Sequence, residues 1–205
     1  MTRAGFLWAK LTANDAWIER QSTSTAALMA ALAGQRIALI GNARSLSQLR
    51  FGPEIDAADI VIRLNSAPIP SEASHGSRTD IIALSTPIPA AILAARNPAR
   101  LLWMTRKRRR LSYGLITRPG FTLNRRADVE ALRLRLGGPP TTGLMMIDLL
   151  ARSDVAATRL YGFDFFASQS LSGRRTAAQV PHDFTAERDF VDRLLARDPR
   201  FALRP

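Results

Sequence analysis

The sequence predicts a single α/β domain in which helices cover both faces of a mostly parallel β-sheet. Short apolar segments rich in β-branched residues alternate along the chain with segments of helical pattern. The length of 205 residues suits one domain, and 46% hydrophobic with 22% charged residues is a globular composition. A disordered or fibrous chain is therefore excluded, and the chain is long enough to bury a core of its own.

The expected elements begin with a helix over residues 15–33, which ends at Gly34, a residue favoured just beyond helix C-termini. Buried strands are expected at residues 36–40, 59–64, 80–84, 100–104 and 158–162. Further helices are expected at residues 89–96, 125–136, 142–152 and 183–196. Short strands separated by helices favour parallel pairing. We expect residues 1–34 to form a helical segment packed on a domain of residues 35–205.

Residue types that build common metal and redox sites are scarce in this chain. It has no cysteine, so disulfides, thiolate zinc sites and cysteine nucleophiles are excluded. Its two histidines are too few for a multi-histidine metal centre, and His75 is expected in a polar loop without a catalytic role. No apolar run approaches the ~18–20 residues of a membrane span, and Lys10 interrupts the first apolar stretch. We expect a soluble cytoplasmic protein that can bind peripherally at the inner membrane surface.

The charge balance indicates an anionic partner. Lys and Arg number 29 against 17 Asp and Glu, which gives a net charge of +12. A nucleotide, a phosphorylated glycan, nucleic acid or an acidic membrane surface would fit this charge. A coding bias toward arginine is the alternative, although it does not explain the shortage of acids. The basic run at residues 106–110 lacks the interleaved aromatic residues of RNA-binding surfaces, so nucleic acid is disfavoured. A solvated loop and a contact with an anionic acceptor or membrane both fit this run.

Polar residues that follow the predicted strands are candidate ligand contacts, because such sheets bind ligands at the carboxyl ends of their strands. Gly41 and Asn42 end the first strand, where an ordinary strand-to-helix turn is the alternative to ligand binding. They form neither a dinucleotide fingerprint nor a P-loop. Arg63 interrupts a buried strand, and ligand contact and an internal ion pair with a carboxylate of residues 54–59 explain it equally well. Asn65, at the end of that strand, is expected to contact the ligand.

Two further segments, each near a predicted helix start, contain residue types suited to phosphate binding or proton transfer. Thr141, Thr142 and Gly143 open a helix whose amides and hydroxyls could cradle a phosphate, with a plain N-cap as the alternative. His182 precedes the last helix, and a histidine side chain can accept a proton near neutral pH. Glu187 could orient this histidine or lie on the solvent face of the helix. A helix cap or surface position is the alternative for His182.

Taken in chain order, these segments resemble the sialyltransferases of glycosyltransferase family 29. The His182 and Glu187 pair, with four residues between them, resembles the last motif of that family. Residues 140–163, from Pro140-Thr141-Thr142-Gly143 to Tyr161-Gly162-Phe163, resemble its short sialyl motif. The stretch from Ile37 to Ile82 resembles its long sialyl motif, through Gly41-Asn42, Gly52-Pro53-Glu54-Ile55-Asp56, Arg63-Leu64-Asn65, Ala67-Pro68 and Gly76-Ser77-Arg78-Thr79.

The resemblance implies a Rossmann-like transferase fold, a variant of the GT-A type, and an inverting transfer of sialic acid or a related keto-sugar acid. The donor would be its CMP ester and the acceptor a glycan hydroxyl, with anionic or membrane-attached glycans among the candidates. No metal and no cofactor would be needed. Nucleotide contacts would come from Gly41, Asn42 and Asn65, while Thr141, Thr142 and Gly143 would cradle ribose and phosphate and His182 would deprotonate the acceptor.

The chain departs from the family pattern in three ways. Positions near Ile37 and Met145, where animal members have paired cysteines, are apolar here, and we expect no membrane anchor. A histidine–aromatic element expected before the last motif is replaced by Ser170-Leu171-Ser172, with Arg174 and Arg175 as candidates for stabilising the leaving group. Two rival functions stay open: a non-catalytic nucleotide- or RNA-binding protein on this fold, and an enzyme with another activated donor.

Overall fold

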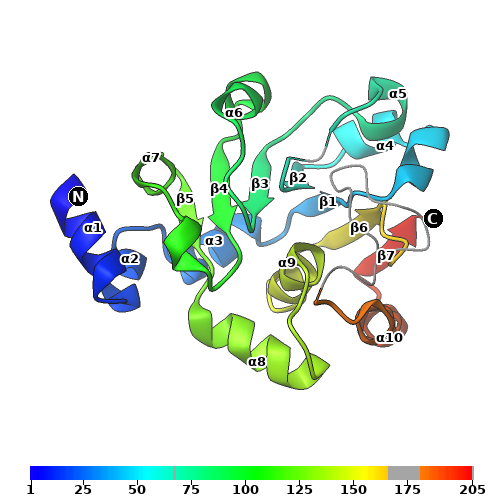
Figure 1. Ribbon diagram of the computed structural model, residues 1–205. Coiled ribbons are helices and arrows are strands. Elements are labelled where there is room, and N and C mark those ends of the chain that lie inside the picture. Colours follow the sequence, from blue (N-terminus) through cyan, green and yellow to red (C-terminus); the bar gives the residue numbers. More distant parts are fainter. Residues whose placement is uncertain (67, 166–180, 205) are drawn as a thin grey trace.

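A parallel sheet of seven strands forms the centre of the computed structural model, which describes residues 1–66, 68–165 and 181–204 (Figure 1). The strand order is β5-β4-β3-β2-β1-β6-β7, and every neighbouring pair is parallel. The predicted α/β class is confirmed. The strands are β1 (Arg36–Ile40), β2 (Ile60–Leu64), β3 (Ile81–Leu84), β4 (Arg100–Trp103), β5 (Phe121–Leu123), β6 (Ala157–Tyr161) and β7 (Phe201–Arg204).

Helices cover both faces of the sheet, so the central strands are buried on both sides. Successive residues of β1 show this: Leu39 packs in the core under one layer of helices and Ile40 in the core under the other. One layer holds α3 (Thr25–Leu32), α8 (Arg126–Leu136), α9 (Thr142–Ala151) and α10 (Phe184–Arg197). The other layer includes α4 (Gly52–Asp56), α6 (Ala90–Arg96) and α7 (Tyr113–Ile116).

The N-terminal segment differs from its prediction. The prediction of a single helix over residues 15–33 is wrong. Instead, α2 (Asp15–Arg20) ends at Arg20, and a separate helix, α3, begins directly after Ser24. The Ser24 hydroxyl accepts a hydrogen bond from the Ala27 amide at 3.1 Å, so a new N-cap interrupts the pattern. An additional helix, α1 (Arg3–Leu11), precedes them and buries Phe6. Within the described residues, no helix combines the length and apolar character that crossing a membrane requires.

Arg63 in β2 holds the chain between α5 (Glu72–His75) and β3, and it is only 2% exposed. Its guanidinium donates to the carbonyl oxygens of His75 and Arg78, at 2.8 and 2.9 Å. The expected ion pair of Arg63 is corrected, because its guanidinium donates to backbone carbonyls and to the Thr79 hydroxyl, at 3.0 Å, and not to a carboxylate. Its burial gives no support to the alternative of ligand contact. The carboxylate of Asp56 instead accepts from the amides of Ser77 and Arg78, at 2.8 and 3.0 Å.

His75 lies at the buried end of α5 rather than in the expected polar loop. Its Nδ1 is 2.8 Å from the hydroxyl oxygen of Ser74. Burial, and secondarily the nearby Arg63 guanidinium, lowers the pKa of His75 to about 4. His75 is therefore a neutral packing residue at physiological pH.

Candidate active site

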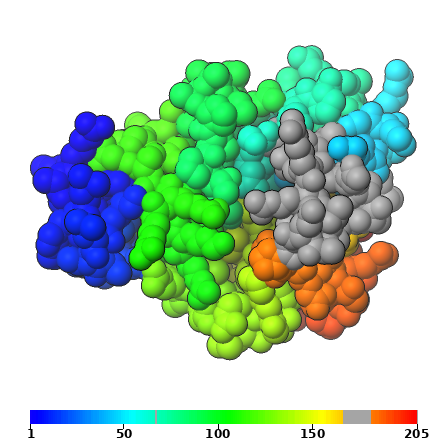
Figure 2. All heavy atoms as spheres, in the orientation of Figure 1, coloured from blue at the N-terminus to red at the C-terminus, as the bar shows by residue number. Residues whose placement is uncertain are grey.

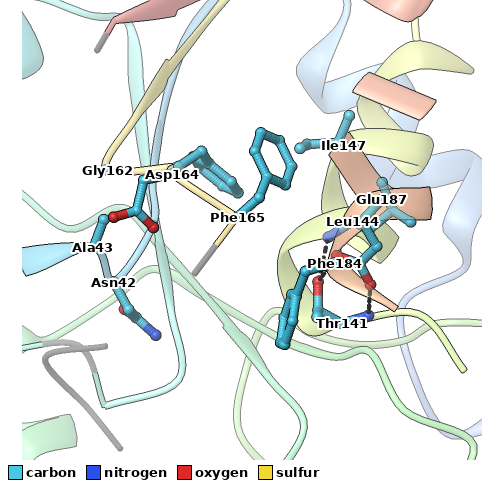
Figure 3. Close-up of a pocket in the computed structure, with 12 residues that line it drawn as sticks. Asn42, Ala43, Thr141, Leu144, Ile147, Gly162, Asp164, Phe165, Phe184 and Glu187 are labelled. Atoms are coloured by element: carbon cyan, nitrogen blue, oxygen red, sulfur yellow. Dashed lines mark hydrogen bonds between the residues drawn. The ribbon is translucent and has the colours of Figure 1, made fainter. Parts of the chain in front are cut away.

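A hollow of about 130 Å³ lies where the strand order of the sheet reverses, beyond the carboxyl ends of β1 and β6 (Figure 3). We call it the β1–β6 hollow. Crevices at such reversal points are the usual ligand sites of open α/β sheets. Segments from four elements line it: Gly41, Asn42 and Ala43 after β1, residues 162–165 after β6, Thr141, Leu144 and Ile147 of the α9 region, and Phe184 and Glu187 of α10.

Gly41 brings the β1 and β6 ends close enough to form this hollow. A Cβ at Gly41 would lie 2.2 Å from the carbonyl oxygen of Gly162, which no real side chain could tolerate. The amides of Gly41 and Ala43 donate to Tyr161 and Gly162 carbonyls, at 2.7 and 3.1 Å. A glycine is thus required at position 41, because the backbone at Gly162 comes too close to leave room for a side chain. Asn42 follows it at the edge of the hollow, on the side away from Thr141 and Phe184 (Figure 3).

Glu187 is bound to Thr141 and not to His182. Its two carboxyl oxygens accept from the Thr141 amide at 2.6 Å and from the Thr141 hydroxyl at 2.7 Å (Figure 3). The same hydroxyl accepts from the Leu144 amide at 3.1 Å and so caps α9. Glu187 is 3% exposed, and this burial raises its pKa to about 7 despite the two hydrogen bonds from Thr141. Both expectations for Glu187 are corrected: it neither contacts the imidazole nor faces solvent.

A larger hollow, of about 590 Å³, lies on the other side of the α9 N-terminus. We call it the His182 hollow. Thr142 lines it, whereas the preceding Thr141 lines the β1–β6 hollow, so consecutive residues of one helix start serve two cavities. Its other walls are Ser85 and Thr86 after β3, Thr105, Arg106, Lys107 and Arg110 after β4, Val129 and Arg133 of α8, Pro139, Pro140 and Met145, and Pro181 and His182 before α10.

A hydrogen-bonded group joins Asn65 to Thr142 and Ser85, which line the His182 hollow, whereas Asn65 itself lines neither hollow. The Thr142 hydroxyl donates to the Ser85 hydroxyl at 2.7 Å, and the Asn65 carboxamide oxygen accepts from the Ser85 amide at 2.9 Å. The Asn65 side-chain nitrogen approaches the Thr142 hydroxyl at 3.5 Å. Asn65 adopts a left-handed backbone (φ 52°), which asparagine tolerates better than most residues. Ser85 was missed by the sequence analysis, although it is the first polar residue after a predicted strand.

His182 turns one ring nitrogen to the protein and lines the larger hollow. Its Nδ1 lies 2.8 Å from the Pro139 carbonyl oxygen, which can only accept. Nδ1 therefore carries the proton in this contact, and the neutral ring keeps the lone pair of Nε2 for an incoming proton. Across the described ranges, no cluster of three or more His, Asp or Glu side chains is arranged to hold a metal ion.

The remaining expected site residues have other surroundings. Gly143 is buried, and a Cβ there would meet the ring of Phe163 at 2.9 Å, so packing of Phe163 accounts for this glycine. Phe163, Phe165 and Phe184 form apolar walls of the β1–β6 hollow that the sequence analysis did not identify. Ala67, Ser170-Leu171-Ser172, Arg174 and Arg175 lie outside the described residues.

Comparisons with known proteins agree on one family. Residues 12–113 match the family model "Glycosyltransferase family 29 (sialyltransferase)". A segment of 46 residues is 48% identical to mouse CMP-N-acetylneuraminate-beta-galactosamide-alpha-2,3-sialyltransferase 1. That segment spans 22% of this chain and only 14% of the mouse enzyme.

Solved structures show the same fold over most of the chain. A mammalian sialyltransferase in complex with Gal-beta-1-3GalNAc-ortho-nitrophenol superposes with a TM-score of 0.60 and 20% identity, covering 87% of this chain and 72% of that one. The Campylobacter jejuni sialyltransferase CstII, in complex with the substrate analogue CMP-3FNeuAc, gives 0.58 and 11% identity, covering 82% and 81%. The transferase fold expected from the sequence is confirmed.

Proposed function

Because residues 12–113 place this chain in glycosyltransferase family 29, the sialyltransferases, we propose that it transfers sialic acid or a related keto-sugar acid from its CMP ester to a glycan hydroxyl. In this proposal residues 35–205 form the catalytic unit, with residues 1–34 as a helical segment against it. The transfer inverts the anomeric carbon in one displacement and uses no metal. The acceptor oxygen bonds to that carbon as its bond to the CMP phosphate breaks, and the hydroxyl proton passes to the enzyme.

The donor nucleotide is assigned to the reversal point of the sheet. Gly41 and Asn42 at the end of β1 line the β1–β6 hollow, and Asn65, at the end of the neighbouring strand β2, is assigned to the same nucleotide. The start of α9 supports the phosphate assignment, since the first amides of a helix have no helical acceptor and carry partial positive charge. Thr142 and Gly143 supply amides of this first turn, and Thr142 also lines the His182 hollow.

The proton acceptor is assigned to Nε2 of His182. The Pro139 carbonyl fixes the ring and its tautomer, so Nε2 is available to a hydroxyl in the His182 hollow. Glu187 then acts as a positioning residue, because it holds Thr141 and with it the start of α9. The imidazolium formed in the step returns its proton to solvent after the products leave.

One observation carries this proposal: His182 and Thr142 line the same hollow, at the start of the helix that also borders the β1–β6 hollow. A base and a phosphate-binding helix start are thereby adjacent at one edge of the sheet. Transfer from CMP-sialic acid to a glycan, measured with the purified protein, tests the proposal directly. Binding of CMP or RNA without any turnover would favour the non-catalytic alternative.

We further propose that the protein lies in the cytoplasm and binds peripherally at the inner membrane surface. The outer face of α1 supports it, because Leu7, Trp8 and Leu11 are 57%, 56% and 87% exposed within two turns of one helix. Figure 2 shows this N-terminal segment (blue) at one end of the molecule, against the green segments that follow β4. Arg109 and Arg110 in those segments are exposed and line a hollow shared with Leu11. Exposed apolar and basic side chains together fit the surface of an anionic bilayer.

A further inference from the structure

The basic run after β4 is a shaped loop in which one arginine is buried. Arg108 is 5% exposed and donates to the carbonyl oxygens of Thr105 at 2.6 Å and Asn124 at 2.7 Å. Its turn, η2 (Arg108–Arg110), fixes the path of the chain on either side. The exposed cations around it are therefore attached to a backbone whose conformation these hydrogen bonds fix.

Three of these cations enter the His182 hollow. Arg106, Lys107 and Arg110 line it, and Arg133 of α8 lines it too. The carboxylate of Glu130 pairs with Arg133 at 2.7 Å and with Arg106 at 3.2 Å. Within the part of the chain that the structure describes, no carboxylate lies within 4.0 Å of Lys107 or Arg110, and no acid lines this hollow.

Arg106, Lys107, Arg110 and Arg133 form what we call the cationic wall of the His182 hollow. This wall lies far from the expected nucleotide position. The sheet order β4-β3-β2-β1 puts three strand spacings between the ends of β4 and β1, about 14 Å at the usual separation. A nucleotide near Asn42 and a sugar near Asn65, Ser85 and Thr142 would fill the part of the edge between β1 and β3. The wall after β4 then borders the acceptor, on the side of the hollow that His182 also serves.

We propose that Lys107 and Arg110, which line this hollow together with Thr86 and Thr105, bind an acidic group on the acceptor glycan, either a carboxylate or a phosphate. The inference rests on the proposed sialyl transfer and specifies its acceptor. Charge-assisted hydrogen bonds are the strong ones in proteins, and the two cations have no competing carboxylate of their own. The acidic group would orient the acceptor so that its attacking hydroxyl faces Nε2 of His182.

The test compares three acceptors that differ at one position: a neutral galactoside, its 6-phosphate and the corresponding galacturonide. The wild-type enzyme should have at least a tenfold lower KM for one of the two acids than for the neutral galactoside. Lys107→Gln and Arg110→Gln should each remove most of that preference, with a much smaller change in the KM for CMP-sialic acid. Arg109→Gln is the matched control. It removes the same charge as Arg110→Gln from the neighbouring position, but the Arg109 side chain does not line this hollow.

Other outcomes overturn the inference. Equal KM values for the three acceptors would show that the enzyme does not recognise an acidic group on the acceptor. Equal losses in Arg109→Gln and Arg110→Gln would show a general charge effect, and a rise confined to the KM for CMP-sialic acid would assign the wall to the donor carboxylate. CMP release from CMP-sialic acid is followed in the same reactions. If it is absent with every acceptor and with water, the proposed transfer itself fails, which is distinct from transfer without acid preference.

Discussion

Glu187 in α10 and Thr141 at the start of α9 are joined by two hydrogen bonds, at 2.6 and 2.7 Å, across 46 residues of sequence. This carboxyl group does not orient His182; it fixes the helix start that borders both hollows. Since Glu187 is buried, its protonation state is linked to folding.

The free energy of unfolding should therefore fall as pH rises from about 4.5 to 7. The folded protein keeps the Glu187 proton up to a pKa of about 7, whereas the unfolded chain loses it near the ordinary value of 4.5. This difference favours the folded state at low pH, by up to about 3 kcal/mol, and the advantage is lost over that window. In Glu187→Gln, which keeps an acceptor for the Thr141 amide, this contribution should disappear. Urea unfolding of both proteins at pH 5 and 7.5 measures it, and parallel pH dependences would contradict the linkage.

Gly41→Ala should destabilise the protein by about 1–3 kcal/mol, because the added methyl group collides with the Gly162 carbonyl. The collision is with backbone, so the β1 and β6 ends must separate and CMP affinity should fall as well. Gly138→Ala is the control, since a Cβ there meets nothing within 4 Å. Thermal unfolding and CMP titration of both variants check this, and equal behaviour of the two would disprove the backbone role of Gly41.

CMP should raise the melting temperature more than UMP or NAD does. Binding stabilises a folded protein by about 2.7 kcal/mol when ligand exceeds Kd a hundredfold. EDTA should alter neither this shift nor transfer, because the phosphate is assigned to the α9 start and not to a metal. A stronger response to UMP, or a loss of transfer on chelation that magnesium restores, would refute the donor assignment.

Vesicles containing anionic lipid should bind the protein, and replacing Leu7 and Trp8 with Gln should reduce the bound fraction several-fold. Both side chains are more than half exposed, so their loss should leave folding intact while removing apolar contact with the bilayer. Co-sedimentation with anionic and zwitterionic vesicles provides the measurement. Equal binding of wild type and the double variant would rule out α1 as the contact.

The sequence was informative wherever burial alone determines structure. The five predicted strands lie within one residue of β1, β2, β3, β4 and β6, because strands covered on both faces are mostly apolar. The strands β5 and β7 were not predicted, since three or four residues beside an established sheet carry little pattern of their own. The break at Ser24 was missed, although residues 19–25 are all polar and include hydroxyl side chains that can cap a helix.

Long-range partners were beyond the sequence pattern. Arg63 in a strand signalled a satisfied buried charge, but its carbonyl partners depend on how the segment after α5 folds back. The Glu187 carboxyl meets Thr141 only because α9 and α10 pack on the same face of the sheet. Neighbouring Thr141 and Thr142 were expected in one cradle, and their separation into two hollows depends on the rotation of the first turn of α9.

The central claim is that His182 accepts the acceptor proton, and turnover by His182→Ala tests it. Proton abstraction by a positioned side chain contributes roughly 10²–10⁴-fold, so kcat should fall by about that factor. The Kd for CMP should stay within about twofold, because the nucleotide is assigned to other elements. Glu187→Gln should lose less, since it acts through Thr141.

Thr185→Ala is the control, as Thr185 is exposed on the first turn of α10, three residues from the histidine. His75→Ala serves as a second comparison, because this buried histidine should change stability and not kcat. The deciding measurement is kcat for transfer from CMP-sialic acid by folded, CMP-binding His182→Ala. A loss of at least a hundredfold beside a normal Thr185→Ala is the predicted result, and wild-type turnover by His182→Ala would contradict the account.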